Sequence, residues 1–149
     1  MSELHTPAKR RLTRDDILPL ADYAVVRRER RRQVSELKRR RRVEVGPFAT
    51  VHFENFETTQ QQVQEMLYIE KGGDAQFAEE FEAYNPMIPQ GSELSGTVIL
   101  EIDDPVRRAA ALNRLGGIVH RAFIDVAGVR VRGEPDPTRE STSSRAPVR

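Results

Sequence analysis

The spacing of apolar residues changes at Val43, and this change constrains the fold more than any other feature of the 149-residue chain. Before it, apolar residues recur at intervals of three and four, which predicts a helix over 20–42 with a narrow apolar stripe. After it, apolar and polar residues alternate over 43–54, which predicts a half-buried strand that bends at Gly46 and Pro47. A chain that contains both periods is expected to fold as α+β.

The rest of the chain supplies further helices and strands. Helical spacing and end signals predict a short turn at 14–18 and helices over 56–71, 74–84 and 105–115. Alternation predicts strands over 97–102, 118–126 and 129–132. We therefore expect a small, mainly antiparallel sheet of about four strands with about four helices packed against it. The expected organisation is one α+β domain over 12–133, between disordered tails at 1–11 and 134–149.

The composition excludes several classes of protein. The chain has no cysteine, which rules out disulfides and thiol catalysis. No apolar run approaches the roughly 20 residues that span a bilayer, and the N-terminus lacks the apolar stretch of a secretory signal. The sequence therefore predicts a cytoplasmic protein without membrane contact.

Charge is segregated along the chain, although the net charge is only +1. Residues 1–42 contain fourteen Lys and Arg against six Asp and Glu. Residues 54–104 contain twelve acidic residues and Lys71 as the one base, and residues 105–149 contain nine Arg against four acids. Such blocks predict complementary faces that meet within the fold, across a dimer or with a partner of opposite charge.

The basic part of the first long helix is the first candidate site. Ten basic residues and two acidic ones lie over 27–42. Arginine guanidinium groups suit bidentate contacts with phosphates, and such binding weakens with salt. The favoured alternative is a solvated helix whose arginines pair with the acidic helices of the same protein. No aromatic residue interleaves with the bases, and no helix-turn-helix signature accompanies them. The candidate anion-binding or partner-binding residues are Arg27, Arg28, Arg31, Lys38, Arg39, Arg40, Arg41 and Arg42.

A second candidate site is polar. An imidazole beside carboxylates could hold a divalent metal, but no Glu-x-x-His pair is present, and we predict no metal ligands.

For the loop that begins at Tyr84 and Asn85 we favour a structural role, as a helix cap and part of the core. His120 alternates with apolar residues and is interpreted as a packed core histidine. The candidate polar residues are His52, Glu54, Glu57, Gln64, Glu65, Tyr84 and Asn85.

The patterns of catalysis are missing from the sequence. The paired glycines stand at helix ends and form no phosphate-binding loop, and no serine lies in a nucleophile motif. We therefore predict no catalytic residues and no cofactor.

Several strings carry a family resemblance. LTRDDILPL, LKRRRRVEVGP, FENFETTQQQVQEML and YNPMIPQGSELSGT, with the later DDP helix start, together resemble the bacterial family of unknown function DUF3501 over about Leu12–Arg132. The resemblance implies a link to oxidative-stress chemistry, because members tend to be encoded near rubrerythrin-like di-iron proteins and iron–sulfur oxidoreductases. Members also continue after the TRE segment into another strand and helix, whereas STSSRAPVR follows it here. A C-terminally truncated member with an exposed sheet edge is therefore expected, and such an edge favours self-association.

Three functions remain open at this stage. The first is a non-catalytic accessory or interaction protein, linked to rubrerythrin-type or iron–sulfur redox systems, that associates with itself or with an acidic protein. The second is a protein that binds nucleic acid or another polyanion through 27–42. The third is a metal-dependent redox enzyme that uses His52 and nearby carboxylates. The first two differ in whether the arginines contact acidic helices or remain exposed.

Overall fold

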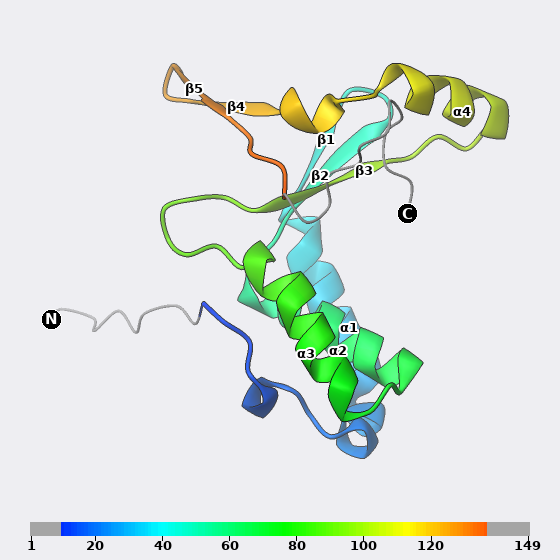
Figure 1. Cartoon of the computed structure of the whole chain (residues 1–149), viewed down its shortest axis with the longest axis vertical. Coiled ribbons are helices and arrows are strands. Elements are labelled where there is room, and N and C mark those ends of the chain that lie inside the picture. Colours follow the sequence, from blue (N-terminus) through cyan, green and yellow to red (C-terminus); the bar gives the residue numbers. More distant parts are fainter. Residues whose placement is uncertain (1–9, 137–149) are drawn as a thin grey trace, which may run out of the picture. The chain divides into compact units, whose positions relative to one another are not determined.

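The structure, a computed structural model, describes residues 10–136, and the contacts within the chain divide it into two compact units (Figure 1). Unit 1 comprises residues 1–100 and unit 2 residues 101–149. The predicted tails lie almost wholly outside the described residues, and the single domain over 12–133 stays a prediction.

Unit 1 contains three long helices and three strands. A 3₁₀ turn, η1, precedes the first helix, and a second one, η2, follows the third. The elements are η1 (Arg14–Asp16), α1 (Leu20–Arg39), β1 (Arg42–Val45), β2 (Ala49–Phe53), α2 (Phe56–Glu70), α3 (Asp74–Tyr84), η2 (Asn85–Met87) and β3 (Gly96–Leu100).

Unit 2 contains one helix and a hairpin. Its elements are α4 (Pro105–Arg114), a 3₁₀ turn η3 (Ile118–His120), β4 (Phe123–Val126) and β5 (Val129–Arg132). The Asp104 carboxylate caps α4 by accepting from the Arg107 N–H at 2.7 Å, as the acidic start signal predicts. The α+β class is confirmed, with the strands divided between two antiparallel sheets.

Two predictions about strands are wrong. The bent strand predicted over 43–54 is a hairpin of β1 and β2, because Gly46 adopts a positive φ of 65° and the chain reverses there. The strand predicted over 118–126 begins only at Phe123, after η3. His120 therefore lies in that turn, where it is exposed and contributes nothing to a core.

The core of unit 1 lies between its helices. α1 packs on α2 and α2 on α3, and the three lie side by side (Figure 1). The buried cluster also includes residues from the segment before α1 and from the turn after α3. Tyr84 is one of its members, which agrees with the core role favoured for the loop that begins at Tyr84 and Asn85. Its members are Leu12, Ile17, Val63, Leu67, Tyr84 and Ile88.

The three-stranded sheet has the order β1-β2-β3 and one entirely apolar face. Residues directly opposite each other in an antiparallel ladder share a face, so the register sorts the side chains. The apolar face consists of Val43, Val45, Ala49, Val51, Phe53, Gly96, Val98 and Leu100. Three of its valines remain about half exposed: Val43 (51%), Val45 (53%) and Val98 (49%). Among residues 10–136, no helix is both long and apolar enough to cross a membrane.

Candidate anion-binding site

One arginine of α1 anchors the helix to α2. The Arg27 guanidinium donates two hydrogen bonds to the Glu65 carboxylate, each of 2.9 Å, and stacks 4.7 Å from the centre of the Tyr68 ring. The Tyr23 hydroxyl donates to the same carboxylate at 2.5 Å and accepts from the Gln61 amide. Charge-assisted bidentate bonds are among the stronger polar contacts in proteins. Arg27 therefore has a structural role.

The pKa values of this cluster reflect its geometry. Burial, followed by the hydrogen bond to Glu65, raises the pKa of Tyr23 to about 12. The hydrogen bond from Arg27 lowers the pKa of Glu65, and the Tyr23 hydroxyl and the charge of Arg31 act in the same direction. The cluster therefore stabilises a carboxylate beside a neutral phenol, which fits an internal anchor.

A hollow beside this anchor is lined by basic residues. It has a volume of about 560 Å³ and lies on the side of α1 that presents residues at helical spacings of three and four. Among residues 10–136, no carboxylate belongs to its lining. The lining residues are Ala24, Arg27, Arg28, Arg31, Arg32, Ser35 and Tyr68.

The four arginines of the hollow differ in their partners. Arg27 is paired as described, and Arg32 pairs along its own helix with Glu29 at 2.7 Å and Glu36 at 2.8 Å. Arg28 and Arg31 are exposed, and neither makes an ion pair within residues 10–136. The hollow therefore combines two neutralised arginines with two whose charge is available.

The remaining predicted basic residues also divide into some that have partners and some that make no ion pair. Arg41 donates to the backbone carbonyls of Phe53 at 2.9 Å and Glu54 at 3.1 Å, so it holds the end of β2. Arg42 pairs with Glu44 on its own strand at 3.3 Å. Lys38 is half-buried, while Arg39 and Arg40 are exposed; within the described residues none of these three makes an ion pair.

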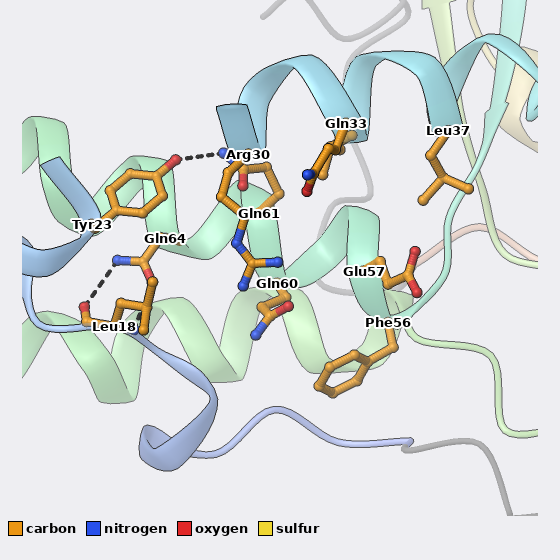
Figure 2. Close-up of a pocket in the computed structure, with 11 residues that line it drawn as sticks. Leu18, Tyr23, Arg30, Gln33, Leu37, Phe56, Glu57, Gln60, Gln61 and Gln64 are labelled. Carbon is orange, nitrogen blue, oxygen red and sulfur yellow. Dashed lines mark hydrogen bonds between the residues drawn. The ribbon is translucent and has the colours of Figure 1, made fainter. Parts of the chain in front are cut away.

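The candidate polar residues do not form one site. Gln64 and Asn85 instead bind the backbone that precedes α1. The Gln64 amide accepts from the Leu18 N–H at 2.8 Å and donates to the Leu18 carbonyl at 3.1 Å (Figure 2). Asn85 makes the equivalent pair with Leu12, at 2.7 and 3.3 Å. Asn85 thus fixes the N-terminal segment and does not cap α3 with its side chain.

The acidic and imidazole groups are likewise dispersed. Glu54 accepts from the Thr58 hydroxyl at 2.5 Å and from the Thr97 hydroxyl at 3.2 Å. His52 is half-buried on β2, and Glu57 is exposed at the start of α2. In the described part of the chain, no three His, Asp or Glu side chains come together as a group that could hold a metal ion.

A second cleft lies between α1 and α2, and sequence reasoning missed it (Figure 2). Its volume is about 430 Å³, and its walls combine apolar residues such as Leu37 with Arg30 and several glutamines. The glutamine run FETTQQQVQEM was the available signal, because Gln60, Gln61 and Gln64 fall at helical spacing. All three amides are already bonded: Gln60 donates to the Asp16 carbonyl, Gln61 to the Tyr23 hydroxyl and Gln64 to the Leu18 carbonyl.

Comparison with known proteins places the chain in a family. A crystal structure of a protein of unknown function from Burkholderia pseudomallei K96243 is 40% identical and superposes with a TM-score of 0.75, covering 81% of this chain and 70% of that chain. No functionally curated protein matches. The family model for DUF3501, a protein of unknown function, matches residues 11–149, nearly the whole sequence. The chain therefore belongs to the DUF3501 family.

Proposed function

We propose that the protein is a non-catalytic interaction protein that binds nucleic acid through the basic side of α1. The observation that carries the proposal is the hollow of about 560 Å³, whose lining in the described part of the chain includes four arginines and no carboxylate. An anion in this hollow would meet the two available guanidinium groups of Arg28 and Arg31. Planar guanidinium groups match phosphate oxygens in bidentate geometry.

The helix extends this basic surface in one direction. Arg28 and Arg31 lie about one turn apart, and Ser35 adds a hydroxyl donor one turn further on. Arg39, also exposed, lies eleven residues beyond Arg28, or roughly 16 Å along the axis at the rise of an α-helix. A surface of this length suits a polymer with repeated phosphates better than a single small anion.

The alternative of internal charge pairing accounts for only part of the helix. It requires the arginines of α1 to contact the acidic helices, and Arg27 is the one whose ion pair reaches α2 among the described residues. An acidic protein would also satisfy an exposed basic surface, and the experiment below separates it from nucleic acid. A link to rubrerythrin-type or iron–sulfur systems rests on the family resemblance alone, and the dispersal of His52 and its neighbouring carboxylates gives a metal-dependent redox role no support.

The test is binding to fluorescent double-stranded DNA and to RNA across a salt series. The variant Arg28→Gln, Arg31→Gln removes the two charges that make no ion pair and leaves both hydrogen bonds between Arg27 and Glu65 in place. We expect binding to weaken about tenfold or more, and the slope of log K against log salt to fall by about 2, one unit for each lost phosphate contact.

The matched control removes two exposed arginines of α4, Arg108→Gln and Arg114→Gln, so the change in net charge is the same. If both double variants lose affinity equally, binding is diffuse and the hollow is not the site. If the wild-type protein binds neither nucleic acid at low salt, the proposal is wrong and the basic surface is left for an acidic protein.

A further inference from the structure

The outer edge of β1 has no strand partner in the described part of the chain, and its backbone groups follow a definite pattern. The Phe53 N–H donates to the Arg41 carbonyl at 2.8 Å. Because hydrogen-bonded pairs alternate along an antiparallel ladder, Val43 also directs its N–H and C=O groups at β2. Arg42 and Glu44 therefore direct theirs away from β2, at the open edge.

We propose that this edge binds a second copy of the chain, β1 against β1 in antiparallel orientation, about a twofold axis at Val43. In this register Arg42 of each copy lies opposite Glu44 of the other. These are the residues whose backbone groups face outward, so the two strands form four hydrogen bonds across the axis. Two ion pairs form on the polar face at the same time.

The side chains select this register over its neighbours. An axis at Arg42 places Arg42 opposite its own copy, and an axis at Glu44 does the same for the glutamate; like charges directly opposite each other are destabilising. An axis between two residues places valine opposite a charged residue and mixes the two faces of the sheet. The alternation Arg-Val-Glu-Val is thus self-complementary only about Val43.

The apolar face supports the same pairing. Val43 and Val45 are about half exposed, although the register places them on the apolar face of the sheet. In the proposed dimer the two Val43 side chains meet in a non-hydrogen-bonded pair, where Cα atoms lie only about 4.5 Å apart. The two sheets then join into one of six strands with a continuous apolar face. A second copy therefore complements this edge in three respects: its backbone donors and acceptors, its charged side chains and its apolar face.

Charge reversal tests the register directly. Arg42→Glu alone and Glu44→Arg alone each place like charges opposite each other twice, and we expect each to raise the dimer dissociation constant about tenfold or more. An equimolar mixture of the two variants restores both opposite-charge pairs, so it is expected to form heterodimers. Sedimentation velocity across a concentration series measures both results, with circular dichroism to confirm that each variant folds.

Cross-linking tests the position of the axis. The chain has no cysteine, so Val43→Cys introduces a single thiol, and a Cα separation of about 4.5 Å lies within the range for a disulfide. We expect Val43→Cys to oxidise rapidly to a covalent dimer. Val45→Cys is the matched control, since it shares the face but lies away from the axis. Equal cross-linking of both would overturn the register.

A monomer at all concentrations would overturn the proposal itself. Hydrogen exchange then shows what lies at the edge, because the Arg42 and Glu44 amides exchange rapidly if it is open and slowly if another segment of the same chain covers it. The inference rests on β1 and does not depend on the hollow of α1. The Arg28→Gln, Arg31→Gln variant is expected to dimerise like the wild type, so failure of either proposal leaves the other standing.

Discussion

The two units differ most in what surrounds their apolar residues. Unit 1 buries its large hydrophobic side chains between helices and around the segment before α1: Leu12, Ile17, Tyr23, Val63, Leu67, Tyr84 and Ile88. In the described part of unit 2 only Ile102 and Leu112 are buried. The hairpin of β4 and β5 has one apolar face, which consists of four side chains. Each of the four is at least 39% exposed: Ile124, Val126, Val129 and Val131.

Alternation therefore identifies the apolar face of a strand pair, but it does not show whether that face is buried. The β4–β5 hairpin and the β1–β3 sheet each sort their apolar residues onto one side. Burial, however, is what stabilises, at roughly 25 cal/mol for each Å² of apolar surface removed from water. The helices of unit 1 achieve this burial within the unit. The strands bury much less of their apolar surface, and this exposed surface is available for association with another chain.

A buried valine of unit 1 and an exposed valine of unit 2 should respond very differently to truncation. Val63 is 0% exposed in α2, and Val129 is 62% exposed in β5. We expect Val63→Ala to lower the free energy of unfolding by about 1.5–3 kcal/mol, because the buried methyl groups leave a cavity. Val129→Ala is expected to change it by no more than about 0.5 kcal/mol. Urea titration measures both, and equal losses would show that the hairpin is covered in solution.

The helices were predictable because their signals are local. The predicted helices over 56–71 and 74–84 each fall within one residue of α2 and α3. Apolar spacing and end signals lie within the segment itself, so no distant contact is needed to place it. The capping carboxylate of Asp104 was predictable for the same reason.

The pairing of strands and arginines was not predictable from local pattern. Alternation over 43–54 continues through Gly46, so the sequence predicts a bend there but not the reversal that the positive φ and the β1–β2 register show. Likewise, nothing in the run of bases distinguishes Arg27, which pairs with α2, from Arg28, which faces solvent. Which arginine finds a partner depends on how α1 packs on α2, which is a tertiary property.

Removing the charge of Glu65, which anchors α1 to α2 in unit 1, should have the next largest effect. Glu65 accepts from Arg27 and Tyr23, and its side chain is 17% exposed. Glu65→Gln keeps the shape but loses a charge-assisted bidentate contact, so we expect a loss of about 1–2 kcal/mol. Glu57→Gln is the matched control, because that carboxylate is exposed on the same helix. A loss no larger than that of the control would show that packing alone holds α1 on α2.

The same anchor predicts how the stability of unit 1 depends on pH. The lowered pKa of Glu65 means that its contribution is complete above the unfolded value of about 4.5 and disappears as the pH falls through the folded-state pKa. The raised pKa of Tyr23 means the reverse: its contribution is complete below pH 10 and disappears as the pH rises through about 12. Urea midpoints measured against pH should therefore fall at both ends. Glu65→Gln should flatten the acid limb, and an unchanged limb would contradict the assignment.

The smallest effect tests whether the two units are separate at all. Asp104 caps α4 in unit 2, and Asp104→Ala should cost about 1 kcal/mol, whereas Asp104→Asn should cost little because asparagine caps equally well. Native-state hydrogen exchange locates the loss, because amides report the free energy of the unit in which they open. If the units are independent, the protection of α4 falls and that of α2 does not change. If α2 loses the same free energy, the chain unfolds cooperatively, as the single domain that the sequence predicts over 12–133.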